Sequence, residues 1–308
     1  MKTFIKVIEI WIPDKDRTQL EFSSGLYGAL TDFKSASKQQ HFAYDEGLPG
    51  KAWAAGHPIV LTKFEHSFFK RTKAAQKVGL TCGIALPIFS GDFLLAVVVF
   101  LCGDDKEHAG AIEVWCNNPD KKDLLHVMDG YYGTLQYFES ISRLTNTPKG
   151  QGIPGIVWQT GMPALMEDIG KLDDFTRSND AQQAGITTGL GIPVGNSDDH
   201  IYVLTFLSAK ATPIAKRIQL WIPDQQEKLL VCQQGYSKNS NNLAEIFETL
   251  TVEKGVGALG RTWLTGMPVI TGNLEDSVYN PELDNLSSML AIPVIRHGRL
   301  KAIVTFLF

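Results

Sequence analysis

An aromatic residue followed two positions later by an arginine occurs twice, as Phe-Lys-Arg at residues 69–71 and Phe-Thr-Arg at residues 175–177. A planar guanidinium beside an aromatic ring can stack on a flat molecule and neutralise its negative charge. The spacing therefore predicts pockets for small anionic ligands. The alternative interpretation is an aromatic side chain anchored in the core beside an arginine exposed to solvent, which gives the same pattern. The candidate ligand-binding side chains of these regions are Phe68, Phe69, Arg71, Phe175, Arg177 and, without an arginine beside it, Tyr279.

The cysteines and histidines form no pattern of catalysis or metal binding. The four cysteines make no Cys-x-x-Cys pair and no cluster with histidine at the spacing of a metal site. The seven histidines pair with no Ser, Cys or carboxylate at a recognisable spacing. We therefore expect no enzyme activity and no cofactor, and reduced, mostly buried thiols.

Composition and charge narrow the class of protein. The chain has 308 residues, of which 44% are hydrophobic and 20% charged, with 29 basic against 33 acidic residues and a net charge of −4. These values exclude a disordered chain and predict no nucleic-acid partner. The longest apolar run, residues 93–102, is about half of the ~20 residues that span a bilayer, and the amino terminus lacks a signal-peptide core. We expect a cytoplasmic protein that binds no membrane.

A box of the form Gly-x-x-Gly-x-x-Trp-x-x-Gly-x-Pro occurs three times, at residues 47–58, 152–163 and 257–268. Its glycines could present helix-start amides to an anion, but a tight turn that lets the tryptophan pack explains them as well. The three copies divide the chain into expected domains 1–105, 106–211 and 212–308, where length alone suggests about two. The box tryptophans are Trp53, Trp158 and Trp263, each 105 residues after the one before, and Trp53 and Trp158 join the ligand-binding candidates.

Apolar periodicity predicts an α+β repeat with mostly antiparallel strands. In the first repeat, Ile8 and Ile10 alternate with Glu9 and Trp11, which indicates a strand. Further strands are expected at 18–25, 38–44, 59–61, 82–89 and 93–102, helices at 49–55 and 67–77, an irregular stretch between 25 and 38, and a tight hairpin at 90–92.

The segments GLPGKAWAAGHPIV and AAQKVGLTCGIALPIFSGDFLLAVVVF of the first repeat together resemble a GAF domain. The second repeat is similar, through GIPGIVWQTGMP and AQQAGITTGLGIPV, and the third shares GALGRTWLTGMP. The first repeat is also similar to the GAF-like region of plant nodule-inception-like regulators, in WIPD, GLPG and GIALPIF.

This resemblance implies three tandem domains of PAS- and profilin-like fold, each a central antiparallel sheet with short connecting helices. It also implies a ligand pocket between one sheet face and the connecting segments, and Cys82, at the start of a predicted strand, is included among its candidate residues. The Cys-His motif of a bilin-binding domain and the Asn-Lys-x-Phe-Asp motif of the cyclic-nucleotide class are missing.

The repeats leave no room for the terminal helices that usually cover the second sheet face in this family. That face is apolar, because Val98 and Phe100 point to one side of the last strand while Val97, Val99 and Leu101 point to the other. We expect the three sheets to cover one another, or the chain to dimerise through them. The side chains expected in those contacts are Trp11, Trp115 and Trp221.

The leading hypothesis is a non-enzymatic small-molecule-sensing or signalling scaffold that acts through a protein partner or a homodimer, because the chain carries no output domain. Copies one and two are the better candidates for a ligand. Two alternatives stay open. One is an enzyme of this fold, such as a thiol-dependent reductase, and the other is a pure protein-interaction module with no ligand.

Overall fold

Each repeat folds into one antiparallel sheet of six strands with the same order of strands. The computed structural model describes residues 3, 5–103, 109–118, 121–172, 175–195, 199–237, 243–247, 250–272, 274 and 284–308. The three sheets run β3-β2-β1-β6-β5-β4, β9-β8-β7-β12-β11-β10 and β15-β14-β13-β18-β17-β16. They fall inside the expected ranges 1–105, 106–211 and 212–308, and the boundary positions themselves stay predictions.

The elements of the first repeat are β1 Ile5–Pro13, β2 Gln19–Leu26, α1 Thr31–Lys38, β3 His41–Ala43, α2 Gly47–Ala55, β4 Ile59–Leu61, α3 Thr72–Lys77, β5 Cys82–Ser90 and β6 Phe93–Cys102. Those of the second are β7 Gly110–Asn118, β8 Lys121–Tyr131, α4 Gln136–Leu144, β9 Asn146–Pro148, α5 Gly152–Thr160, β10 Ala164–Glu167, a 3-10 turn Ile169–Lys171, α6 Ser178–Gln183, β11 Thr188–Val194 and β12 Tyr202–Ser208. Those of the third are β13 Arg217–Pro223, β14 Leu229–Ser237, α7 Leu243–Phe247, β15 Thr251–Glu253, α8 Gly257–Thr265, β16 Val269–Thr271, β17 Met289–Arg296 and β18 Arg299–Leu307.

Three elements of the first repeat differ from the sequence expectation, one of them the helix expected at 67–77, which spans only Thr72–Lys77. The stretch expected to be irregular contains helix α1, and the strand expected at 38–44 is only His41–Ala43. Helix α1 has the sequence TDFKSASK, in which only Phe33 and Ser37 are buried. A helix with one large buried apolar side chain shows no strong apolar period in its sequence. The place of α1 is set by packing of Phe33 against the domain core rather than by local pattern.

The box glycines are explained by backbone geometry. Gly47 has φ of +61° and Gly56 has φ of +71°, a region that favours glycine. Gly50 has no positive φ, but a Cβ placed on it would lie 2.2 Å from the carbonyl oxygen of Ala43. Its amide donates to the carbonyl of Glu46, so Gly50 lies inside a helix that begins at Gly47 and presents no free amide to an anion. The turn interpretation of the box is therefore the correct one.

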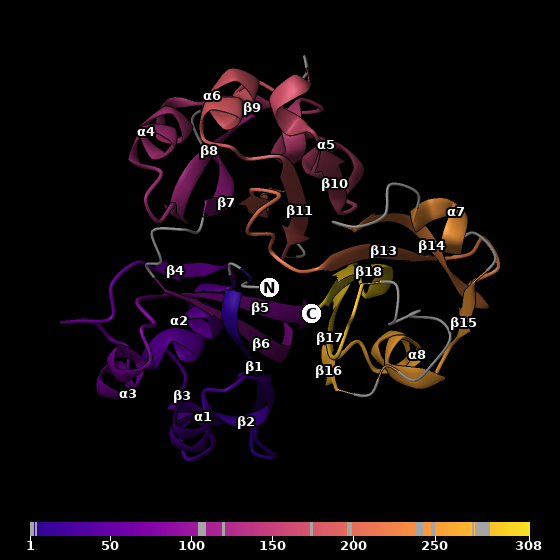
Figure 1. Cartoon of the computed structure of the whole chain (residues 1–308). Helices are drawn as coiled ribbons and strands as arrows, with labels where there is room; N and C mark the ends of the chain where they lie inside the picture. Colours follow the sequence, from indigo (N-terminus) through magenta and orange to yellow (C-terminus); the bar gives the residue numbers. More distant parts are fainter. Residues whose placement is uncertain are drawn as a thin grey trace.

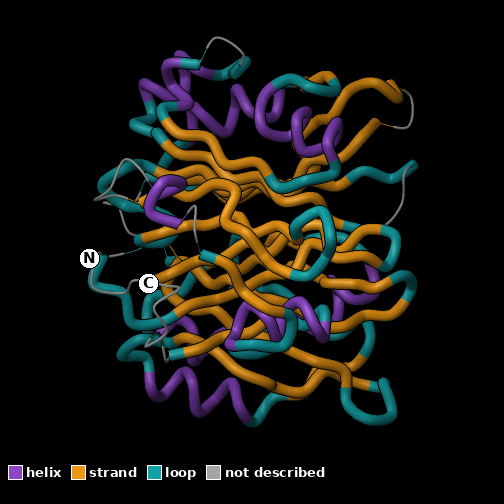
Figure 2. The backbone as a smooth tube through the Cα atoms, turned by 90° about the vertical axis from the view of Figure 1, so that its right-hand side faces the viewer, coloured by secondary structure: helices purple, strands orange, loops and turns teal. Residues whose placement is uncertain are grey.

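The three sheets pack together through their outer faces and form one apolar core, which we call the shared core. The three repeats are arranged around it as three lobes, with β5, β11 and β17 toward the middle (Figure 1). Three phenylalanines on the closing strands meet there, with ring centroids 5.2 to 6.1 Å apart: Phe100, Phe206 and Phe306. Strands fill the middle of the molecule in the view turned by 90° (Figure 2).

This arrangement confirms that the sheets cover one another and that Val98 and Phe100 face away from Val97 and Val99. The expectation for the tryptophans of the opening strands is wrong. Their side chains are fully buried on the other face of each sheet, in the core of their own repeat: Trp11, Trp115 and Trp221. They share that face with the residue two positions earlier, because strand side chains alternate.

Candidate functional site

The interior of the first repeat holds a buried ion pair where the resemblance implies a ligand pocket. Arg71 precedes helix α3 and reaches Glu9 on strand β1, which is fully buried. The guanidinium donates from Nη1 to Oε1 of Glu9 at 2.5 Å and from Nη2 to Oε2 at 2.8 Å. Arg71 also donates to the hydroxyl of Ser37 on helix α1. The cation that sequence analysis assigned to a ligand is thus paired with a carboxylate of the same repeat.

Aromatic rings enclose this pair. The Arg71 guanidinium carbon lies 5.5 Å from the Trp11 ring centroid, 4.9 Å from that of Phe33 and 5.2 Å from that of Phe69. These distances are within the range of a cation–π interaction. Phe69, predicted to contact a ligand, instead contacts the chain's own cation, and its side chain is buried.

The Glu9 carboxylate is held in its ionised form. Burial alone would raise the pKa of Glu9, but the attraction and hydrogen bonds of Arg71 outweigh it and hold that pKa below its ordinary value. Trp11 Nε1 donates to Oε2 at 3.0 Å, and the Tyr27 hydroxyl donates to Oε1 at 2.9 Å. Burial, followed by the Glu9 charge, strongly raises the pKa of Tyr27, so this hydroxyl stays a donor.

The second repeat contains the same arrangement. Arg177 donates to Glu113 at 2.6 and 3.0 Å and to the hydroxyl of Ser142. Its guanidinium carbon lies 5.4 Å from the Phe175 ring centroid. Burial opposes the ionisation of Glu113 as well, and Arg177 again lowers the pKa of the carboxyl below its ordinary value. Trp115 Nε1 donates to the same carboxylate at 2.9 Å.

The third repeat inverts the ion pair. Here the arginine, Arg217, lies on the strand, and the carboxylate, Asp284, comes from the segment before β17. Arg217 Nε donates to Oδ2 of Asp284 at 2.7 Å, and the Ser237 hydroxyl donates to Oδ1 at 2.6 Å. Gln219 replaces the strand glutamate, and Trp221 Nε1 has no hydrogen-bond partner. Tyr279, the candidate of this repeat, lies outside the described residues.

Other predicted site residues lie away from these interiors. Phe68 is exposed, with the Lys51 ammonium 5.3 Å from its ring centroid. Cys82 is fully buried, but it lies in the shared core on the opposite sheet face, opposite Cys102 on β6. It therefore does not join Phe69 and Arg71, and its placement in the ligand pocket is wrong.

Trp158 lies at the junction of the second and third repeats, whereas Trp53 packs against the core of its own repeat and against Tyr44. The box of each repeat packs against the β-hairpin that closes the next one, so the junctions form a closed cycle. His57 of the first box stacks on Tyr202 of the second hairpin with centroids 4.7 Å apart. A Cβ on Gly161 would lie 3.2 Å from Nη1 of Arg296, and one on Gly266 would lie 3.2 Å from Cδ1 of Leu95.

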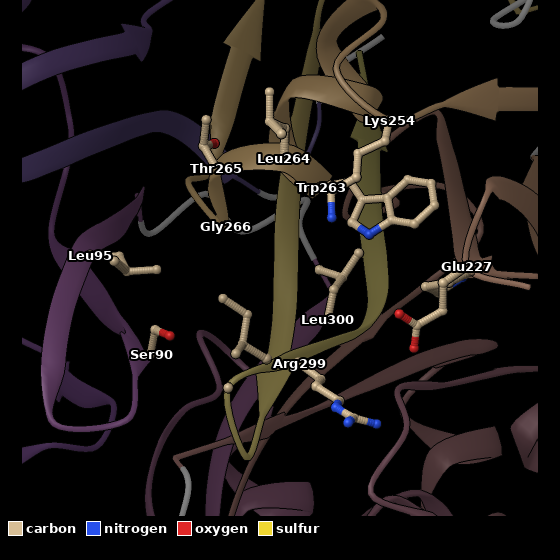
Figure 3. A pocket seen from close by; sticks show the side chains of 13 residues that line it. Ser90, Leu95, Glu227, Lys254, Trp263, Leu264, Thr265, Gly266, Arg299 and Leu300 are labelled. Atoms are coloured by element: carbon tan, nitrogen blue, oxygen red, sulfur yellow. The ribbon is translucent and has the colours of Figure 1, made fainter.

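Cavities are found at these junctions. One of about 340 Å³ lies between the third box and the first hairpin. In Figure 3, Lys254 lies beside the Trp263 ring, while Ser90 and Leu95 approach from the first repeat. A second of about 460 Å³ lies between the second box and the third hairpin, beside Trp158.

The carboxylates of the ion pairs were not predicted from the sequence. A signal was present, because Glu9 and Trp11 share a strand face, as do Glu113 and Trp115. If the tryptophan is buried, the glutamate two residues before it is buried too, and a buried carboxylate needs a cation. Among the described residues, no group of three or more His, Cys, Asp or Glu side chains could hold a metal ion.

No protein-family profile and no curated protein sequence matches the chain. Solved structures match about one repeat. The nlh2 GAF domain of A. aeolicus in an inactive state is 25% identical, with a TM-score of 0.27, and the match covers 33% of this chain and 61% of that one. The free methionine-R-sulfoxide reductase of Neisseria meningitidis, in complex with its substrate, is 16% identical with a TM-score of 0.26. That match covers 32% of this chain and 52% of the reductase chain.

A third similar structure is the Staphylococcus aureus NreA protein mutated in its nitrate-binding site, 16% identical with a TM-score of 0.25; the match covers 30% of this chain and 73% of that one. The chain consists of three tandem α+β domains, each a six-stranded antiparallel sheet with short helices. No helix in the described part of the chain is both long and apolar enough to cross a membrane.

Proposed function

We propose that this chain is a non-enzymatic regulatory scaffold of three GAF-like domains, in which each domain interior is closed by the chain's own ion pair. The observation that carries the proposal is the pairing of Arg71 with Glu9, repeated by Arg177 with Glu113. An anionic ligand could reach either guanidinium only by displacing a carboxylate that already makes two hydrogen bonds to it. A signal then passes through a protein partner or a change of oligomeric state.

The ion pairs also bear on ligand sensing in the interior. A neutral or anionic molecule would have to separate charges that are almost completely buried, and a buried charge without its partner is costly. The cavities of about 340 and 460 Å³, by contrast, are each lined by two repeats. Small molecules that regulate this scaffold therefore bind between repeats rather than inside them.

Thiol-dependent catalysis, the enzyme alternative, has little support from the cysteines. Cys82 and Cys102 have no exposed surface. Burial raises the pKa of the Cys232 thiol to about 12, which removes the thiolate at neutral pH. Cys116 is partly buried, and burial raises its pKa as well.

Mass spectrometry of the purified full-length chain after denaturation tests the proposal. We expect no small molecule released in a 1:1 ratio with the chain. A stoichiometric metabolite that is retained by the native chain and lost in Arg71→Met or Arg177→Met would overturn the closed interior. For the enzyme alternative, methionine sulfoxide and peroxide are offered to the native chain and to Cys82→Ser; we expect no turnover by either, and turnover that the substitution abolishes would make the chain an enzyme.

A further inference from the structure

The cavity between the second and third repeats is lined by basic side chains. Its volume is about 460 Å³, within the range of small-molecule sites. Lys149 comes from the second repeat, while Arg296, His297 and Lys301 come from the hairpin of β17 and β18. No Asp or Glu is among the described residues that line it. Positive charge from two repeats therefore converges on one solvent-open cavity.

The Trp158 ring forms part of its wall. The Lys149 ammonium lies 5.6 Å from the Trp158 ring centroid, a distance that holds the lysine at the cavity by a cation–π contact. Arg296 lies against Gly161, at the carboxyl end of helix α5. A partial negative charge at that helix end favours the arginine there, so Lys149 and Lys301 are the cations most available to a ligand.

The other two junctions provide internal comparisons. At the junction of the third and first repeats, Lys254 occupies the place of Lys149, but Glu227 and Arg299 line that cavity together and balance part of its charge. Figure 3 shows their side chains on the same side of it. At the first junction, Tyr44 replaces the lysine beside the box tryptophan, with ring centroids 5.3 Å apart.

The basic hairpin is a property of the third repeat alone. Its tip reads Arg-His-Gly-Arg-Leu-Lys over residues 296–301, where the first hairpin reads Ser-Gly-Asp-Phe-Leu-Leu over residues 90–95. Arg299 lines the cavity shared with the first repeat, whereas Lys301 lines the one shared with the second. One short segment thus contributes Arg299 to one cavity and Arg296, His297 and Lys301 to the other.

We propose that the cavity formed by Lys149, Trp158 and Lys301 binds a small anion with at least two negative charges, of the phosphorylated-metabolite class. The two lysines come from different repeats, so one anion placed between them makes charge-assisted hydrogen bonds to both. Such a ligand binds only when the two repeats are docked, and it stabilises their junction. The inference goes beyond the proposed function, since the site is tested without any assumption about signalling.

Isothermal titration calorimetry of the full-length chain with inorganic pyrophosphate at low ionic strength tests the site. We expect one pyrophosphate per chain. Lys149→Gln and Lys301→Gln each weaken binding about tenfold, the size expected for one charge-assisted hydrogen bond. The matched controls are Arg299→Gln on the same hairpin and Lys254→Gln at the equivalent position of the third repeat, and each changes affinity less than about twofold. All four variants remove one positive charge.

Three results would overturn the site. The first is no pyrophosphate binding by the unaltered chain at millimolar concentration. The second is an equal loss of pyrophosphate affinity in Lys301→Gln and Arg299→Gln, because equal losses would show that binding depends on the net charge of the chain rather than on this cavity. The third is tighter binding of a hexaglutamate peptide than of pyrophosphate with the same dependence on Lys149 and Lys301, which would assign the surface to an acidic protein partner. Circular dichroism of each variant shows that it is folded.

Discussion

Removal of the arginine from one interior ion pair is expected to destabilise the whole chain. Arg71→Met keeps an unbranched apolar side chain in place but leaves the carboxylate of Glu9, which has no exposed surface, without its cation. Breaking a buried pair from one side costs about 3–5 kcal/mol of unfolding free energy. The loss of the hydrogen bond to Ser37 and of the contacts with three aromatic rings acts in the same direction.

The double substitution Glu9→Gln with Arg71→Met separates the cost of an unpaired charge from the cost of lost packing. The third repeat already places a glutamine, Gln219, at the equivalent strand position beside Trp221. In the third repeat Trp221 Nε1 has no hydrogen-bond partner beside this glutamine, so the double variant is expected to remove the unpaired charge without depending on a bond to Trp11 Nε1. We expect the double variant to be about 1–3 kcal/mol more stable than Arg71→Met alone, the usual coupling of groups in contact.

Urea unfolding at pH 7, followed by tryptophan fluorescence with linear extrapolation, measures these differences. The control is Arg143→Met, which breaks a pair with Glu139 in which the Arg143 side chain is 43% exposed; we expect a change of no more than about 0.5 kcal/mol. The reasoning fails if Arg71→Met costs no more than this control. It also fails if the double variant is no more stable than the single one.

Three further predictions concern the shared core, the box and acid. Phe206→Ala lowers the unfolding free energy by about 3–5 kcal/mol and shifts the transition of tryptophan reporters in all three repeats, whereas a shift confined to the second repeat would contradict a shared core. Gly50→Ala brings a Cβ to 2.2 Å from a carbonyl oxygen. It is expected to lower the melting temperature far more than Gly28→Ala, because a Cβ on Gly28, at φ of +52°, has no atom within 4 Å. Equal losses of melting temperature in the two variants would refute this explanation of the box glycines. Folding lowers the pKa values of Glu9 and Glu113, so the stability that these carboxylates contribute is complete above the ordinary pKa of 4.5 and is lost as pH falls through the lowered values. The urea midpoint is therefore expected to fall between pH 6 and pH 3, and a constant midpoint would contradict the ionised pairs.

The repeat was predictable from the sequence because the backbone geometry of the box requires glycine at the same positions in each copy. Gly47 and Gly56 adopt positive φ, and Gly50 passes too close to a carbonyl for any Cβ. The apolar alternation of strand β6 was equally informative, since Val98 and Phe100 do face the shared core. These constraints are local, so they recur at the same spacing in each copy.

Contacts between distant segments could not be predicted in the same way. The pairing of Glu9 with Arg71 joins residues 62 positions apart, and the short helix that supplies Ser37 carries almost no apolar pattern. The basic cavity combines Lys149 with Lys301, which belong to different repeats. Nothing in the sequence near either lysine indicates the other, because the cyclic packing of box against hairpin is a property of the assembled sheets.

The closed interior is tested most directly by NMR of the arginine side chains in the full-length chain, with Arg71→Met and Arg177→Met used for assignment. A guanidinium held by a carboxylate on two of its nitrogens rotates slowly and is shielded from water. The ion pairs therefore predict separate, slowly exchanging Nη signals for Arg71 and Arg177 in the chain without any added ligand, unchanged by pyrophosphate. Nη signals that become visible only when a small molecule is added would contradict an interior closed by the chain's own carboxylates.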